Sequence, residues 1–305
     1  MREVSLDGLR LIGKGSCGTV YALGADRVIK VYDAHPETPE RAGREARISQ
    51  EAYARGVPTV RCDETVRCGD VYAAIYEKAE GVSGEDILKQ EPERAEELAA
   101  RFAALGRQLH RTPAPGEIFG DARQKLGPAS AGAMLGAWVT PEEARKWEAL
   151  VAAVPDRGTM VHTDFHLGNV MIRGEKMVLI DVGAVGHGHP VLDFLSLYLG
   201  AEEPQFTKIE LGQDVNRRVF EAYFRAYFGE GLTAEGEALA RELIRFTAAL
   251  PYTPLLCASF RPGECGEAVE SWIRAKLSLV LGETPETLRA KFEAADRLCF
   301  RETGA

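Results

Sequence analysis

The periodicity of the hydrophobic residues changes near residue 80, and this change constrains the fold more than any other feature of the chain. Before it, residues 19–23, 28–32 and 71–76 are short segments rich in β-branched and aromatic side chains, which is typical of strands. One helix is expected among them, over residues 38–55, because Thr-Pro-Glu opens this segment and a glycine ends it. The first eighty residues are therefore predicted to form a β-rich lobe with one helix.

Beyond residue 80 the apolar residues recur at spacings of three and four, beginning with the segment from Ala95 to Leu109. A compact β island interrupts this pattern at residues 160–162, 170–172 and 177–180. Further helices are expected near residues 190–200, 213–228, 234–249, 266–281 and 285–299. We therefore predict an α+β protein with a small β-rich lobe over residues 1–80 and a larger, mainly helical lobe over residues 81–305.

Three details of the helical region follow from local signals. A Thr-Pro-Glu start signal recurs at Thr140 and at Thr284. At the first of these, Glu143 stands three residues after the threonine and completes a capping box. The stretch Pro251–Glu267, which contains Tyr252, Phe260 and Arg261, is expected to be irregular, and it could border a pocket or merely join two helices.

The composition argues against several classes of function. A formal net charge of −9 argues against a nucleic-acid partner, because affinity for a phosphate backbone comes mainly from clustered Lys and Arg. Residues 1–10 lack the apolar core of a signal peptide, and no segment has the uncharged length of a membrane span, so a soluble, cytoplasmic protein is expected. The six cysteines form no Cys-x-x-Cys pair, and Cys62 and Cys68 are expected to be free, buried thiols.

The segment Gly13–Val20 has the glycine spacing Gly-x-Gly-x-x-Gly. In a dinucleotide-binding fold such glycines open a helix, whereas here a β-branched and aromatic strand follows. A strand, a glycine loop and a second strand form a flap whose backbone N–H groups can approach phosphate oxygens, since glycine has no Cβ. If the motif stood alone, a plain hairpin turn would be the better interpretation.

Lys30 lies ten residues beyond Val20, on the face of its strand that also carries Val28. A lysine on the inner face of an apolar strand needs an anionic partner, because the loss of water around its charge is costly. Nucleotide phosphates and a helix carboxylate can provide that partner. Glu45, in the middle of the expected helix, is favoured as the carboxylate, and Glu51 is the alternative.

The segment His162–Asn169, with the sequence His-Thr-Asp-Phe-His-Leu-Gly-Asn, is followed twelve residues later by Asp181-Val182-Gly183. Transfer of a phosphate to a hydroxyl needs a carboxylate that orients and deprotonates the acceptor, and oxygen ligands that hold Mg²⁺. Asp164 and Asn169 lie in one loop, and Asp181 ends a returning strand, so the three can point into one site. Each residue alone could be an ordinary turn residue, but the ordered set favours this chemistry.

With these motifs the chain resembles the protein-kinase-like superfamily, and specifically its aminoglycoside phosphotransferase and choline kinase branch, from Gly13 to Leu199. His166 is similar to the second His of that branch's His-x-Asp-x-His-x-x-Asn pattern, where protein kinases usually carry Lys. The segment Gly188-His189-Pro190 is similar to the branch's Gly-Asp-Pro and follows without the long activation segment of protein kinases. The resemblance implies a two-lobed fold and Mg²⁺-dependent transfer of a phosphate from ATP to a small molecule.

The resemblance also implies roles for individual residues. Asp164 would be the catalytic base, and Asn169 and Asp181 would coordinate Mg²⁺. Lys30 would hold the α- and β-phosphates of ATP and would be oriented by Glu45.

The other implied nucleotide contacts come from the flap, from the linker after residue 76 and from two valines over the adenine ring. The flap would close over the phosphates, and the linker would meet the adenine edge through its backbone groups. These residues are Gly13, Gly15, Ser16, Gly18, Val20, Val28, Glu77 and Ala79. His162 and Asp193 would brace the catalytic loop, and His166 would either brace it or contact the γ-phosphate.

The function predicted from the sequence is that of a small-molecule kinase, acting on a hydroxyl of an aminoglycoside-like or other amino- or hydroxyl-bearing metabolite. A Ser/Thr protein kinase is the alternative, because the glycine loop resembles that of protein kinases. A pseudokinase used as a binding module is a third class, and the complete set of Lys30, Asp164, Asn169 and Asp181 argues against it. Glu202, Glu203 and Glu210 could attract an amine on the acceptor, but a solvated acidic face is the favoured interpretation of these residues.

Overall fold

The computed structural model describes residues 1–15, 18–33, 38–127, 131–207 and 209–300. These residues group into two compact units, each described by itself. The first unit contains residues 1–90 and 167–185, and the second contains residues 91–166 and 186–305. Residues 81–90 and 167–185 therefore group with the β-rich part of the chain. The division of the chain into two lobes after residue 80 stays a prediction.

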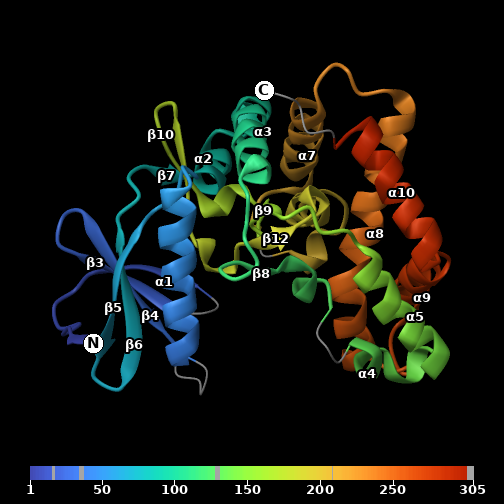
Figure 1. Ribbon diagram of the computed structural model, residues 1–305, viewed down its shortest axis with the longest axis horizontal. Coiled ribbons are helices and arrows are strands. Elements are labelled where there is room, and N and C mark those ends of the chain that lie inside the picture. The colour runs from blue at the N-terminus through green and yellow to red at the C-terminus, as the bar shows by residue number, and fades with distance from the viewer. Residues whose placement is uncertain (16–17, 34–37, 128–130, 208, 301–305) are drawn as a thin grey trace. The chain divides into compact units, whose positions relative to one another are not determined.

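The first unit is built on a sheet whose described strands run in the order β1-β5-β6-β4-β3-β2 (Figure 1). Their bounds are Arg2–Glu3 for β1, Leu11–Gly15 for β2, Gly18–Leu23 for β3, Arg27–Tyr32 for β4, Cys62–Cys68 for β5 and Val71–Glu77 for β6. Helix α1 (Thr38–Ala54) packs against β5 and β6. These elements confirm the strands and the helix predicted for the first eighty residues.

The two faces of this sheet bury different side chains, as period-two alternation along β4 requires. Ile29 packs on one face with Val66, Ala73 and Ile75. Tyr32, two residues beyond Lys30, packs on the other face with Ala42 and Ala46 of α1. The same cluster contains Cys62 and Ala74, and Tyr72 and Tyr76 pack against it. Lys30 therefore lies on the face of the sheet that α1 covers.

The rest of the first unit is a small sheet in the order β11-β10-β7, with helix α2 beside it. Its elements are β7 (Val82–Ser83), α2 (Gly84–Gln90), η4 (Leu167–Asn169), β10 (Val170–Arg173), β11 (Lys176–Leu179) and η5 (Val182–Ala184). Gly81 has a φ of 116°, and a Cβ at this position would collide with the carbonyl oxygen of Ile172. Glycine is therefore required where the chain passes β10.

The second unit is mainly helical and has its own small sheet in the order β8-β12-β9. The strands are β8 (Gly120–Asp121), β9 (Thr159–Val161) and β12 (Gly186–Gly188). The α-helices are α3 (Ala95–Arg111), α4 (Ala131–Leu135), α5 (Pro141–Ala153), α6 (Leu195–Glu202), α7 (Gln213–Phe228), α8 (Ala234–Ser259), α9 (Glu267–Leu281) and α10 (Pro285–Leu298). Short 3₁₀ helices are η1 (Pro92–Arg94), η2 (Ala122–Lys125), η3 (Gly136–Trp138), η6 (Pro190–Phe194) and η7 (Pro204–Phe206).

Local signals predicted the starts of these helices better than their ends. The capping box at Thr140 is present, with the Thr140 hydroxyl and the Glu143 carboxylate each accepting a backbone N–H, and Thr284 caps α10. The prediction of an irregular stretch over residues 251–267 was wrong for residues 251–259, because α8 continues through Pro251 and Pro254 to Ser259, and it is confirmed for residues 260–266, which join α8 to α9. Burial of Thr253, Pro254 and Cys257 in the unit's interior outweighs the local preference of proline to end a helix.

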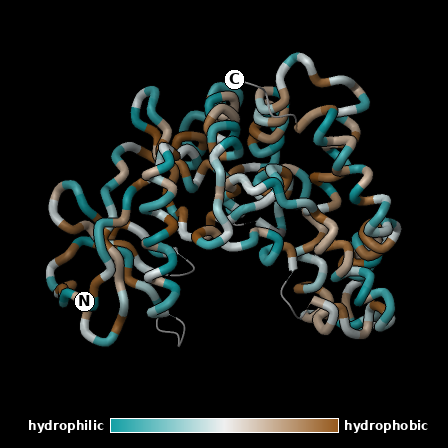
Figure 2. The backbone as a smooth tube through the Cα atoms, in the orientation of Figure 1, coloured by the Kyte–Doolittle hydropathy of each residue, from teal (hydrophilic) through white to brown (hydrophobic). Residues whose placement is uncertain are grey.

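Hydrophobic and hydrophilic residues are interspersed along the helices and strands of both units (Figure 2). Accordingly, no helix within the described ranges is long and apolar enough to cross a membrane. Cys62 and Cys68 are buried and free, as predicted, and burial raises the pKa of the Cys62 thiol to about 12.

An aromatic core lies where α3 and α7 pack together, and Figure 1 shows these helices side by side. The rings of Phe102 and Phe165 stack with centroids 4.1 Å apart, and Tyr223 is fully buried beside both. Gly106 leaves room for the Tyr223 hydroxyl, because a Cβ there would collide with it. Within the described part of the chain, this buried hydroxyl has no hydrogen-bond partner.

We expect replacement of Tyr223 by Phe to raise the free energy of unfolding, by up to about 1 kcal/mol, because a buried hydroxyl without a partner is destabilising. Urea unfolding of the wild type and the variant measures this difference. As a matched control, Tyr227→Phe should be destabilising, because the Tyr227 hydroxyl lies 2.8 Å from His110 Nδ1. A loss of stability in Tyr223→Phe would mean that its hydroxyl has a partner after all.

Candidate functional site

In the first unit, Lys30 is held between two carboxylates. Its Nζ lies 3.1 Å from Glu45 Oε2 and 2.7 Å from Asp181 Oδ1. The side chains of Lys30 and Glu45 are 16% and 8% exposed, whereas that of Asp181 is 54% exposed. The ammonium group of Lys30, on β4, therefore contacts one carboxylate from α1 and a second from Asp181, 151 positions further along the chain.

The charges around Lys30 keep its side chain protonated. Burial by itself lowers the pKa of Lys30, but the carboxylates of Asp181 and Glu45 outweigh this effect, and the pKa is raised above its ordinary value. Glu45 also accepts a hydrogen bond from Arg41 Nε, 2.9 Å from its other oxygen. Glu45 thus has one cation on each oxygen, which fixes its carboxylate toward Lys30.

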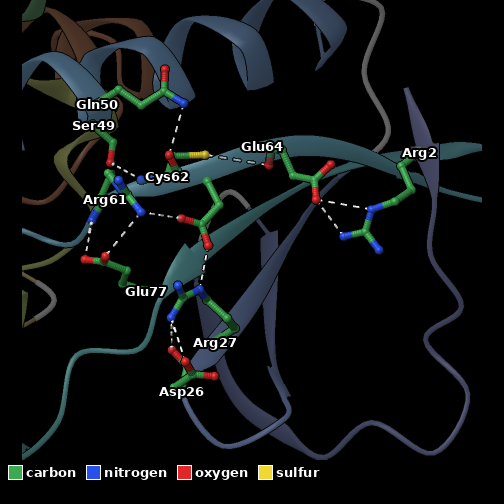
Figure 3. Close-up of polar contacts among 10 residues, drawn as sticks. Arg2, Asp26, Arg27, Ser49, Gln50, Arg61, Cys62, Glu64 and Glu77 are labelled. Atoms are coloured by element: carbon green, nitrogen blue, oxygen red, sulfur yellow. Dashed lines mark hydrogen bonds and ion pairs between the residues drawn. The ribbon is translucent and has the colours of Figure 1, made fainter.

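The position of Glu45 depends on hydrogen bonds between α1 and Cys62, the first residue of β5, which Figure 3 shows. The Ser49 hydroxyl accepts the N–H of Cys62 at 2.9 Å and donates to the carbonyl of Val60 at 2.8 Å. The Gln50 side chain donates to the carbonyl of Cys62 at 3.0 Å. These contacts hold Glu45, one turn earlier, on the face that meets Lys30. Glu51, the alternative partner, instead pairs with Arg55.

Asp181 is positioned by a link between β11 and the segment that precedes β5. The carbonyl of Leu179 accepts the Thr59 hydroxyl at 2.9 Å, and the N–H of Leu179 donates to the carbonyl of Pro58 at 2.7 Å. Asp181 then adopts a left-handed backbone with φ of 55°. The N–H of Ile180 donates to the carbonyl of Asn169 at 2.9 Å, so the backbones of the two predicted metal ligands are neighbours.

The strands predicted on either side of the glycine loop are confirmed, because β2 and β3 pair antiparallel with Gly15 opposite Gly18 and Gly13 opposite Val20. Gly18 has a φ of 155°, and a Cβ there would collide with the carbonyl of Val31, so the close approach of β3 to β4 requires glycine. Val20 lies opposite Lys30 in the ladder, and both therefore project from the same face of the sheet. Ser16 lies outside the described residues.

The backbone N–H groups of the linker after β6 differ in whether they have a partner. The N–H of Glu77 donates to the carbonyl of Arg61, and the N–H of Lys78 donates to the carbonyl of Asp26. Among the described groups, the N–H of Ala79 has no such partner. Arg61 also lies 3.7 Å from the Glu77 carboxylate, which directs that side chain toward β5 (Figure 3).

In the second unit, Asp193 holds the loop that carries Asp164. Its carboxylate is fully buried and accepts the backbone N–H groups of His162 and Thr163, at 2.8 and 2.7 Å. Thr163 has a φ of 67°, which is rare for a β-branched residue and is destabilising by about 1–3 kcal/mol. The two hydrogen bonds to Asp193 hold this strained turn immediately before Asp164, as the implied bracing role of Asp193 requires.

Sequence reasoning missed two further members of this network, His110 and Tyr227. His110 Nε2 lies 2.9 Å from the Asp193 carboxylate, and its Nδ1 lies 2.8 Å from the Tyr227 hydroxyl. Because Nε2 faces a carboxylate, it carries the proton, and Nδ1 accepts from Tyr227. The only available signal was a histidine in the last turn of an amphipathic helix, which is also a common capping residue.

Asp164 lies at the surface of the second unit, with its side chain 59% exposed. Its Oδ1 is 3.5 Å from His166 Nε2 and 3.5 Å from the Ser196 hydroxyl. Of the acidic residues considered for an amine, Glu203 is buried and pairs with Lys276, and Glu202 lies 3.6 Å from Arg217. These two carboxylates therefore already have cationic partners within the chain.

Comparison with known proteins gives a consistent family. The model of the phosphotransferase enzyme family matches residues 8–243. An ADP-bound aminoglycoside phosphotransferase, APH(2'')-Ib, aligns with a TM-score of 0.56 at 17% identity, over 90% of this chain and 93% of that chain. A choline/ethanolamine kinase family protein from Mesorhizobium loti aligns with a TM-score of 0.52 at 21% identity, over 96% and 93%. These likenesses confirm the predicted protein-kinase-like α+β fold. No curated protein matches the sequence significantly.

Gly183 offers a test of the packing that presents Glu45 to Lys30. A Cβ at Gly183 would lie 2.5 Å from Glu45 Cγ and 2.8 Å from its Oε2, so we expect Gly183→Ala to lower the free energy of unfolding by about 1–3 kcal/mol.

The matched control is Gly43→Ala on the exposed side of α1, where an added Cβ meets nothing within 4 Å. This change should stabilise the protein by up to about 1 kcal/mol, because alanine favours a helix more than glycine. Urea unfolding compares the two variants, and equal changes in both would contradict the described packing.

Proposed function

The chain belongs to the phosphotransferase enzyme family and is a phosphotransferase, and from this premise we propose that it transfers the γ-phosphate of ATP to a hydroxyl of a small molecule. The observation that carries the proposal is the position of Lys30, whose ammonium group is held charged between Glu45 and Asp181. A largely buried, protonated lysine beside a half-exposed carboxylate suits a site that receives a polyphosphate and a cation.

The residues of the first unit fit a nucleotide with Mg²⁺. Asn169 and Asp181 supply two oxygen ligands from neighbouring backbone segments, and Mg²⁺ commonly takes few protein ligands, completing its shell with phosphates and water. Among the described residues, no group of three His, Cys, Asp or Glu side chains is placed to hold a metal ion by itself. When bound, the ion would neutralise charge on the β- and γ-phosphates.

The nucleotide contacts proposed from the sequence agree with the local geometry. Lys30 would exchange its contact with Asp181 for the α- and β-phosphates and keep its contact with Glu45. The flap formed by Gly13, Gly15 and Gly18 would lie over the phosphates, and the Ala79 N–H and Glu77 carbonyl would meet the adenine edge. Val20 and Val28 share the Lys30 face of the sheet, where they can pack over the ring. Structures with similar folds are described with ADP, ATP and GDP, so both purines belong in a test.

In the proposed reaction, the acceptor oxygen forms a bond to the γ-phosphorus, and the bond from that phosphorus to the β–γ bridging oxygen breaks. The electron pair of the broken bond leaves with ADP, and the proton of the acceptor hydroxyl passes to the Asp164 carboxylate. Asp164 and Asn169 are five positions apart, which limits the separation of their Cα atoms to about 18 Å. One loop therefore carries both the proposed base and a proposed ligand of Mg²⁺.

A small-molecule acceptor is favoured over a protein by the segment between Asp181 and Asp193. It consists of η5, β12 and η6 in immediate succession, which leaves no length for an activation segment that would dock a polypeptide. Aminoglycosides are the first acceptors to test, since one neighbour is described as a complex with streptomycin and ATP at a TM-score of 0.52.

The proposal predicts different consequences for two aspartates. Asp164→Asn should lower kcat by roughly 10²–10⁴-fold while Mg·ATP still raises the Tm, because a general base acts on the reacting proton rather than on nucleotide binding. Asp181→Ala should remove the Mg·ATP-dependent rise in Tm, because it deletes a proposed metal ligand.

The assay is nucleotide consumption with ATP or GTP, screened against aminoglycosides, choline-like amines, sugars, nucleosides and generic proteins. The same preparations give the Tm with and without Mg·ATP. Near wild-type turnover in Asp164→Asn would show that another group accepts the proton.

A further inference from the structure

Two side chains from different elements converge on one oxygen of Asp164. The Ser196 hydroxyl, in the first turn of α6, and His166 Nε2, in the catalytic loop, each lie 3.5 Å from Oδ1. We infer that Ser196 is a positioning residue, which donates a hydrogen bond to Asp164 and holds its carboxylate in the orientation that accepts the proton. This inference rests on the proposed function for the role of Asp164, although the contact itself does not.

The place of Ser196 in the chain explains how it can orient Asp164. Ser196 follows Asp193 by three positions, which places the two residues on the same side of one helical turn. Asp193 is buried and binds the backbone N–H groups of His162 and Thr163, directly before Asp164. A single turn of η6 and α6 therefore holds the loop backbone through Asp193 and the base itself through Ser196.

Residues of α3 and α7 hold Asp193 itself in place. His110 binds the Asp193 carboxylate, and Tyr227 binds His110; the side chains of Asp193 and His110 are buried, and Tyr227 is partly buried. Leu195 and Leu197 flank Ser196, and Leu197 is 4% exposed. The hydroxyl of Ser196 therefore projects from a backbone that cannot easily move, which is what a positioning residue needs.

The Ser196 hydroxyl is better suited to position Asp164 than the titratable side chains near Asp164 are. It donates one hydrogen bond without carrying a charge, so its effect on Asp164 does not depend on pH across the neutral range. Titratable groups that face Asp164 in the described part of the second unit include His166 and Tyr252. The pKa of Tyr252 is raised by burial and by the negative charge of Asp164, so its phenol stays protonated. His166 adds a charge only when it is protonated.

A contact of 3.5 Å is long for a hydrogen bond, and in enzymes such contacts often tighten when the substrate binds. Hydrogen bonding to the charged form of a carboxylate favours that form. Loss of the Ser196 hydroxyl should therefore make Asp164 easier to protonate and leave it in several orientations. Both effects lower kcat and leave the binding of the acceptor largely unchanged.

The experiment uses the full-length protein with ¹³C-labelled aspartate carboxyl groups. The Asp164 signal is identified by its loss in Asp164→Asn, and its titration midpoint is measured by NMR. In Ser196→Ala we expect the midpoint to rise by about half a pH unit. We expect kcat for the best acceptor to fall by roughly three- to tenfold, with KM within twofold and the acidic limb of the pH profile moved to higher pH.

Two variants control the interpretation. Ser196→Thr keeps the hydroxyl and should restore the midpoint and most of kcat. Ser259→Ala makes the same deletion at an exposed serine of α8, whose hydroxyl donates to the carbonyl of Leu255, and should match the wild type in both measurements.

The outcomes separate this inference from the proposed function. A shifted midpoint in a protein that phosphorylates no acceptor would support the contact and reject the function. An active enzyme whose Asp164 midpoint is the same in wild type and Ser196→Ala would overturn the inference. It would also be overturned if Ser196→Ala raised KM at constant kcat, because Ser196 would then bind the acceptor rather than position the base.

Discussion

The structure depends on the burial of one ammonium group. Lys30 projects from the face of the sheet that α1 covers, its side chain is 16% exposed, and a largely buried charge without partners would be strongly destabilising. Glu45 and Asp181 satisfy it, and each is brought there by its own anchor, Ser49 on α1 and Thr59 before β5. The half-exposed side of this arrangement, at Asp181, is where a nucleotide with Mg²⁺ would exchange with the ion pair.

The second unit presents the carboxylate of Asp164 directly after a strained turn at Thr163. Thr163 adopts a left-handed backbone, and the buried carboxylate of Asp193 compensates with two hydrogen bonds to that turn. The same 3₁₀ and helical turn carries Ser196 to Asp164. A network of polar groups, reaching back to Tyr227, thus holds the loop that carries Asp164.

Sequence reasoning predicted what depends on nearby residues. Period-two alternation placed Lys30 and Val28 on one face, and helix position favoured Glu45, which the structure brings to Lys30. It could not predict contacts such as Thr59 with Leu179 or His110 with Asp193, because these join segments 120 and 83 positions apart and depend on packing rather than local preference. For the same reason α8 continues through Pro251, where local signals predicted its end.

The most direct test of the account is a crystal structure with Mg²⁺ and a non-hydrolysable ATP analogue. The account predicts that Lys30 Nζ keeps its hydrogen bond to Glu45 and contacts the α- and β-phosphates, while the carboxylate of Asp181 leaves Lys30 and coordinates Mg²⁺ together with Asn169. A nucleotide bound away from Lys30, or an Asp181 that still contacts only Lys30 while the metal lies elsewhere, would contradict it.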